Sequence, residues 1–257
     1  MPLRLSTGLR NFVNAAGSMK DALQNGQLLI YTGAQPATAD TAPSGTLLVT
    51  ITDASATRTA EVLATGTVTL ATGAAGSVDA ITVNGVSILD APVAYATSLT
   101  VTATNVATAI NRSASNPEYT ATASGAVITI RAKRGSGAGA NGFVVTGTLT
   151  TLTATYANMA SGVTAVNGLK FGISAAGVVD KHATQVWTGV AVATGTAGWF
   201  RFVGSVADGG ATDAAETEIR MDGAISTSGA QINMSNTTIT AAATETVSSF
   251  PLTLPTS

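Results

Sequence analysis

The sequence contains no cysteine and a single histidine, His182. Without thiols the chain forms no disulfide bond, no zinc–thiolate site and no iron–sulfur cluster. Any Ser-His-Asp triad would have to use His182, which follows Asp180, and no Gly-x-Ser-x-Gly elbow marks a nucleophile. We therefore expect a protein that is not an enzyme and has no cofactor, with His182 at the surface or at an interface.

Charged residues are scarce as well. They make up 10% of the 257 residues, and the formal net charge is −2. Nucleic-acid-binding proteins usually carry a basic excess, so we do not expect nucleic acid as a partner. No window of eighteen strongly apolar residues predicts a transmembrane helix, and the apolar runs near the N-terminus are too short for a signal peptide. The sequence predicts a protein that is made in a cytosol and has no membrane partner.

Small residues dominate what is present. The chain has 47 Ala, 43 Thr, 27 Gly and 20 Ser, which together are just over half of it, and aromatic residues are only 5%. Val, Ile, Leu and Phe recur in the alternation typical of strands. The strands expected in the outer parts of the chain are residues 27–32, 46–52, 169–173, 186–192, 198–203, 216–221 and 246–254. A short helix is expected at residues 18–24, where Ser18 and Asp21 form a capping box and Gly26 follows.

The middle of the chain differs in character. It is rich in Thr, Ala, Val and Gly, and it predicts strands at residues 66–70, 80–83, 120–123 and 126–131. Asn84-Gly85 is typical of a type I′ hairpin turn, and Ser124-Gly125 is a second hairpin signal. Val106, Ala109 and Ile110 share one face of a helix expected within residues 98–113.

The fold class expected from these patterns is mainly β. Residues 1–57 and 167–257 would form a discontinuous antiparallel β-sandwich. Residues 58–166 would form a small inserted α+β module, a sheet with one helix packed on it. Because few large apolar residues are available, each domain alone has a thin core, and association with further copies would add buried surface.

Several segments resemble a family of small virion proteins of tailed bacteriophages. The residues that carry the resemblance are 5–11 (LSTGLRN), 30–40 (IYTGAQPATAD) and 195–201 (GTAGWFR). The middle region is similar to a module of other phage tail and surface proteins, through residues 81–86 (ITVNGV), 106–111 (VATAIN) and 119–125 (YTATASG). Many members of the first family are compact, and this chain departs from them by its inserted middle region.

The resemblance implies a structural protein of the virion that is made in the host bacterial cytoplasm. It would be a capsid decoration protein or a component of the head–tail neck or collar, acting through subunit–subunit contacts as a homo-oligomer. Its partners would be further copies of itself and other virion proteins of the capsid, portal, neck or tail. The head or neck is favoured because the chain lacks heptads and shaft repeats. The alternatives are a tail-tube, baseplate or tail-fibre-associated protein, or an adhesin that binds the host surface.

Two groups of residues are candidates for an interface. Trp199 and Arg201 share one face of a strand, and either they lie in the core or they anchor a partner at the surface, where Trp and Arg are enriched. Arg131, Lys133 and Arg134 precede a glycine-rich loop. That loop is either a solvated hairpin, a backbone cradle for an anion, or a charged contact with an acidic neighbour.

Acidic residues near the C-terminus are the remaining candidates. Glu216 and Glu218 are two apart on an expected strand, which indicates a solvent-facing side rather than an acid–base pair with Asp222. Asp208, Asp213 and Glu216 are either calcium ligands or a solvated loop, and the spacing matches no EF-hand. We therefore expect no metal site.

Overall fold

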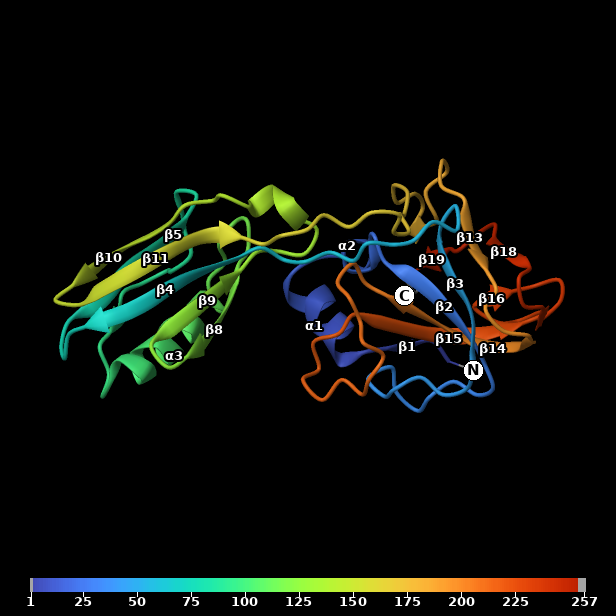
Figure 1. The fold of residues 1–257 in the computed structure, drawn as a ribbon, viewed down its shortest axis with the longest axis horizontal. Helices are drawn as coiled ribbons and strands as arrows, with labels where there is room; N and C mark the ends of the chain where they lie inside the picture. Colours follow the sequence, from blue (N-terminus) through green and yellow to red (C-terminus); the bar gives the residue numbers. More distant parts are fainter. Residues whose placement is uncertain (1, 254–257) are drawn as a thin grey trace. The chain divides into compact units, whose positions relative to one another are not determined.

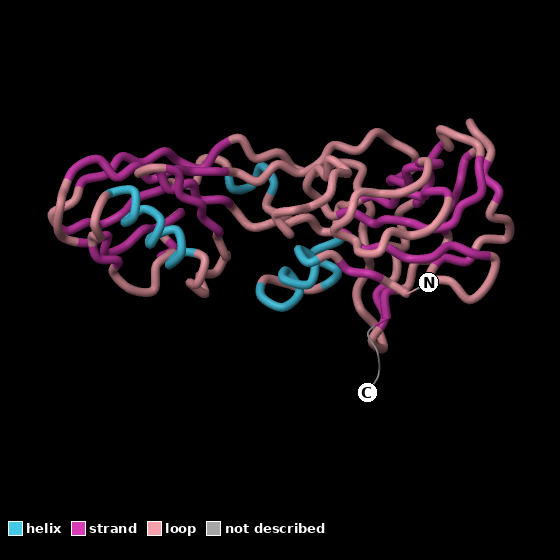
Figure 2. The backbone as a smooth tube through the Cα atoms, turned by 90° about the horizontal axis from the view of Figure 1, so that it is seen from below, coloured by secondary structure: helices cyan, strands magenta, loops and turns pink. Residues whose placement is uncertain are grey.

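The computed structural model describes residues 2–253 and divides the chain into two compact units. Unit 1 consists of residues up to Ala60 together with those from Ala165 onward, and unit 2 is Glu61–Thr164. Both units are built mainly of antiparallel strands (Figure 1). Figure 2 shows that strands, in magenta, make up most of the regular structure. The expected fold class, mainly β of the β-sandwich type with a small helix-containing insert, is confirmed.

Unit 1 is organised around one nine-stranded sheet with the order β1-β15-β14-β2-β3-β13-β18, to which β16 and β17 attach at β15 and β14. A two-stranded sheet, β12-β19, accompanies it. The elements are β1 (Arg4–Leu5), α1 (Thr7–Ala15), α2 (Met19–Leu23), β2 (Gln27–Thr32), β3 (Leu47–Asp53), β12 (Val178–Val179), β13 (Trp187–Val190), β14 (Gly195–Val203), β15 (Arg220–Ser226), β16 (Ile232–Asn233), β17 (Thr238–Ile239), β18 (Thr244–Val247) and β19 (Leu252–Thr253).

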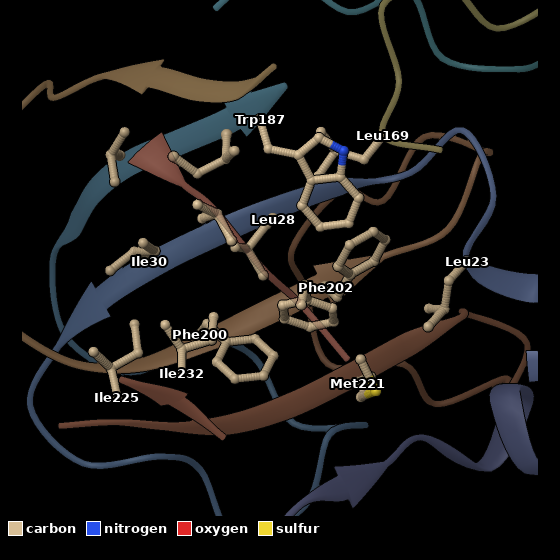
Figure 3. Packing of buried hydrophobic residues seen from close by; sticks show 14 of the residues in the cluster. Leu23, Leu28, Ile30, Leu169, Trp187, Phe200, Phe202, Met221, Ile225 and Ile232 are labelled. Atoms are coloured by element: carbon tan, nitrogen blue, oxygen red, sulfur yellow. The ribbon is translucent and has the colours of Figure 1, made fainter. Parts of the chain in front are cut away.

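An aromatic cluster forms the centre of the unit 1 core. Trp187, Phe202 and Phe250 have ring centroids within 6.0 Å of one another, and Phe171 and Phe200 pack against them. Figure 3 shows Phe200, Phe202 and Trp187 converging on one face of the sheet. Aromatic pairs of this kind add stabilisation beyond the area that they bury.

Local hydrogen bonds explain the two helices of unit 1. In α2 the Ser18 side chain accepts from the Asp21 backbone N–H, and Asp21 accepts in return from Ser18, so the predicted capping box is confirmed. Helix α1 was not predicted. The Ser6 side chain caps it by accepting from the Leu9 N–H at 3.1 Å, and Leu9 is fully buried.

Unit 2 contains two four-stranded sheets with the orders β10-β5-β6, with β7 also on β5, and β11-β4-β9-β8. The elements are β4 (Thr65–Thr72), β5 (Ser77–Val83), β6 (Val86–Ser87), β7 (Val93–Ala94), α3 (Leu99–Ile110), β8 (Thr120–Ser124), β9 (Val127–Arg131), the 3₁₀ helix η1 (Gly137–Ala140), β10 (Val145–Thr150) and β11 (Thr153–Ala160).

The local predictions for unit 2 are confirmed where turn chemistry or helical spacing supported them. Asn84 and Gly85 both have positive φ, at 51° and 80°, as a type I′ turn requires. Helix α3 buries Val106 and Ile110, and Ala109 packs partly against the same core. That core consists only of residues of unit 2.

Other predicted strands differ from the structure. Strands β10 and β11 were missed because their Thr, Ala and Gly content resembles that of the loops. The strand expected at residues 216–221 begins only at Arg220, and residues 169–173 make isolated bridges instead of a strand. The strand expected at residues 246–254 is divided between β18 and β19, and Leu254 lies outside the described residues.

The chain leaves unit 1 and returns to it through paired backbone. Thr59 and Val166 exchange two N–H···O=C hydrogen bonds of 3.1 Å, and Val62 and Val163 form the corresponding pair within unit 2. Each hydrophobic cluster draws its members from a single unit. The segment 60–165 is therefore an insertion between two neighbouring backbone positions of unit 1.

Unit 1 is expected to fold without the insertion. Replacing residues 60–165 by Asn-Gly leaves Thr59 and Val166 as the pair that flanks a two-residue type I′ turn. Both tryptophans of the chain belong to unit 1, so their fluorescence reports on that unit alone. We expect a native-like emission spectrum and one cooperative thermal transition, and a non-cooperative melt with solvent-exposed tryptophan emission would contradict independent folding.

Candidate functional site

Strand β14 is buried on both of its faces. Phe200 and Phe202 point into the aromatic core, whereas Trp199 and Arg201 lie on the opposite face and are 0% and 1% exposed. The Trp199 ring stacks on Tyr31 with the centroids 4.6 Å apart, and the Arg201 guanidinium lies 5.5 Å from the Trp199 ring centre. Of the two alternatives for Trp199 and Arg201, the structure shows burial inside the unit, and neither side chain is exposed. Their face of the sheet is covered by the chain itself.

Two ion pairs lie on this covered face. Arg201 binds Asp222 on the neighbouring strand through two hydrogen bonds, Nε to Oδ1 at 2.8 Å and Nη2 to Oδ2 at 2.7 Å. Arg220 binds Asp208 in the same two-pronged manner, with both distances 2.6 Å. All four side chains are at most 5% exposed. Bidentate pairs of this kind fix the orientation of both partners.

Burial changes the proton affinity of these groups. Burial raises the pKa of the Asp222 carboxyl above its ordinary value, although the Arg201 guanidinium acts in the opposite direction. Burial also raises the pKa of the Tyr31 hydroxyl, again against the effect of Arg201. Asp222 thus depends on Arg201 to carry a charge inside the protein at neutral pH.

The cover over this face is the loop of residues 33–44, which we call the strap. The Asp40 carboxylate accepts hydrogen bonds from the backbone N–H and the hydroxyl of Thr7, at 2.8 and 2.9 Å. Arg201 donates to the Thr41 carbonyl at 3.0 Å, and Arg220 donates to the Asp40 carbonyl at 3.2 Å. Arg4 also donates to the carbonyl of Pro36. Polar contacts with the buried arginines therefore hold the strap in place.

The acidic residues are dispersed rather than gathered. The Asp213 carboxylate accepts from the Glu218 backbone N–H at 2.7 Å, and Asp208 is committed to Arg220. Glu216 and Glu218 precede β15, so the expected solvent-facing strand side with these two residues is wrong: neither lies in a strand. Among residues 2–253, no three His, Asp or Glu side chains lie close enough together to hold a metal ion.

The basic cluster of unit 2 borders a backbone cradle that is already occupied. Arg131 and Lys133 are exposed, and Arg134 is half-buried. The glycine-rich segment after them folds partly into η1, and the backbone N–H groups of Gly135 and Gly137 donate to Glu61 Oε1 at 2.8 and 2.9 Å. The predicted anion cradle is thus present, but it holds the chain's own buried carboxylate.

His182 contacts Thr184 in the described structure. Its Nδ1 lies 2.9 Å from the Thr184 hydroxyl, on a half-buried loop. Asp180 instead holds the C-terminal segment, because its carboxylate accepts from the Phe250 backbone N–H at 2.7 Å and from the Ser249 hydroxyl at 3.0 Å. Partial burial alone would raise the pKa of Asp180, but these bonds and the one from the Lys181 N–H lower it overall.

An apolar groove of about 700 Å³ lies beside this segment in unit 1. Phe200, Met221 and Phe250 are core residues that reach its floor, and Figure 3 shows Phe200 and Met221 on neighbouring strands. Its sides come from α1, α2, β12 and β19; their apolar residues are Val13, Met19, Val179 and Leu252. Sequence analysis missed this groove because its residues come from segments far apart in the chain, and none forms a motif.

The comparisons with family models, curated proteins and solved structures found no match to this chain. The resemblance to virion proteins of tailed bacteriophages therefore stays a prediction from the sequence. Of the candidate interface residues, the exposed Arg131 and Lys133 remain at the surface of unit 2. The groove adds a second candidate surface, in unit 1.

Breaking the buried ion pair is expected to cost more than removing it. Asp222→Asn leaves Arg201 buried without a counter-charge, and we expect a loss of about 3–5 kcal/mol in the free energy of unfolding. The double variant Arg201→Met with Asp222→Leu removes both charges of this pair, so neither partner is left unpaired, and it should lose less. Urea unfolding followed by tryptophan fluorescence measures both.

The control for this comparison is Glu216→Gln, which removes one exposed carboxylate from the same unit. It should change the free energy of unfolding by less than about 0.5 kcal/mol. If Asp222→Asn were as mild as this control, the ion pair would contribute nothing to the stability of the fold.

The contribution of Asp180 to the stability of the folded chain is expected to disappear in acid. Its pKa is lower in the folded chain than the ordinary value of about 3.9, so its stabilising effect is complete above that value and is lost as the pH falls through the folded pKa. Wild type should therefore melt at a higher temperature than Asp180→Asn at pH 7, and the difference should vanish well below pH 4. A difference that stayed constant into strong acid would contradict this assignment.

Proposed function

We propose that this protein is a structural component of a tailed-bacteriophage virion, either a capsid decoration protein or a subunit of the head–tail neck or collar. Two observations support this role: the sequence resemblance and the apolar groove of unit 1. The protein would act through contacts between subunits, with no chemical step.

The groove supports this role because its floor is continuous with the hydrophobic core. Soluble monomers seldom leave a large apolar concavity open, and such surfaces commonly mark interaction sites. Val186, Val190 and Val192 are also at least half exposed in the same unit. Covering these surfaces in an assembly would add the apolar burial that the small-residue composition does not supply.

The resemblance and the absence of shaft-like sequence repeats favour the head or neck over the tail. No helix within residues 2–253 is long and apolar enough to cross a membrane. The alternatives, a tail-tube, baseplate or tail-fibre-associated protein or a host-binding adhesin, differ from the proposal in the position that they predict within the particle. Removing unit 2, which carries the exposed Arg131 and Lys133, would therefore show where in the particle the protein lies.

The proposal is tested by imaging virions that carry the Asn-Gly replacement of residues 60–165. Cryo-electron microscopy difference maps against wild-type particles locate the lost density. Loss over the whole capsid surface identifies a decoration protein, and loss confined to a ring at the portal vertex identifies a neck or collar subunit.

Two results would overturn the proposed position or the proposal as a whole. Density lost along the tail or at its tip would favour the tail or adhesin alternatives. If purified particles lacked the protein by mass spectrometry and the maps were unchanged, it would not be a virion component at all.

A further inference from the structure

We propose that two copies of this chain associate about a two-fold axis, with Ile173 of each copy seated in the apolar groove of the other. The inference deepens the proposed function, on which it rests, because it names the partner of the groove as a second copy. Ile173 is an exposed apolar side chain, the groove lies beside it, and a hydrogen-bonded turn follows it in the chain.

Ile173 is the most exposed large aliphatic side chain among residues 2–253, at 87%. It lies outside the lining of the groove, but the next residue, Ser174, and Gly177 belong to that lining. Burying the Ile173 side chain and covering the apolar groove would each be favourable, and neither occurs in the single chain. Both occur when the groove receives the isoleucine of another molecule.

An ordered turn follows Ile173 in the chain. Ala175 and Val178 exchange two backbone hydrogen bonds of 2.9 Å, and the two residues between them, Ala176 and Gly177, have positive φ of 48° and 76°. This is the geometry of a type I′ turn, and β12 then pairs with β19. Because the backbone of residues 175–178 is already hydrogen-bonded, this part of the surface loses little conformational entropy when a partner binds beside it.

The chemistry of the two surfaces favours an uncharged partner. Residues 173–177 carry no charge, and Lys20 is the only charged residue in the lining of the groove. A partner recognised by charge would find few groups to bind here. An apolar projection, such as the one this chain itself carries, matches the groove.

The adjacency of Ile173 and the groove points to a closed, symmetric pair. When both complementary surfaces lie next to each other, one two-fold axis brings each isoleucine to the other groove at the same time. Each dimer then contains the contact twice. Widely separated surfaces would instead join head to tail and continue into a chain of subunits.

The test is sedimentation equilibrium of the purified full-length protein over about 1–500 μM, a range that covers weak and moderate dimers. We expect a concentration-dependent dimer for wild type. Ile173→Asp should raise the dissociation constant by about a hundredfold, since each of the two buried isoleucines contributes at least a factor of ten. Val13→Lys, which changes the groove side of α1, should do the same.

Two comparisons make the test specific. Val144→Asp is the matched control, because it introduces the same charge at a valine that is 50% exposed and outside the groove. It should leave the dissociation constant unchanged. Mixing Ile173→Asp with Val13→Lys should restore the dimer, because the mixed pair keeps one native contact and places Asp against Lys in the other.

A monomeric wild type over the whole range would overturn the inference. So would a dimer that is unaffected by Ile173→Asp, or an Ile173→Asp and Val13→Lys mixture that stays monomeric. These outcomes concern the solution behaviour of the chain only. The proposed function fails separately, when purified virions lack the protein.

Discussion

Burial of strand β14 on both faces is the constraint on which the rest of unit 1 depends. One face carries Phe200 and Phe202 and requires an apolar core. The other carries Trp199 and Arg201, and a guanidinium that is 1% exposed requires a counter-charge. Asp222 lies directly opposite Arg201 in the register of β14 and β15 and supplies that charge. The strap then follows from the buried arginines, because its Thr41 and Asp40 carbonyl groups accept further hydrogen bonds from Arg201 and Arg220.

What could be predicted from the sequence was decided by local chemistry. The capping box of Ser18 and Asp21, strand β2 and the Asn84-Gly85 turn each depend on neighbours a few residues apart. The burial of Trp199 and Arg201 does not depend on such close neighbours. Alternation separates the two faces of a strand, but it does not show which faces are covered. The cover is a loop rich in Ala, with two Pro and two Thr among its twelve residues, and this composition is also that of a solvated connection.

The same distinction applies to the glycine-rich loop of unit 2. Its composition correctly indicated backbone N–H groups free to converge on an anion. The anion is Glu61, which is 74 residues before Gly135, and no local pattern links the two. Arg131 and Lys133 could be recognised as surface charges. By contrast, the apolar groove of unit 1 combines residues from both ends of the chain, so only the folded structure brings it together.

The pairing of Thr59 with Val166 has a consequence for how such a chain changes over time. Hydrogen-bonded partners in an antiparallel ladder have Cα atoms about 5.5 Å apart, so any domain whose own ends lie that close can occupy this position. The loop entropy lost on closing the gap grows only slowly with the length of the insert. One module can therefore replace another at this position, in the course of evolution or by design. The strands of the unit 1 sheet keep their register when this happens.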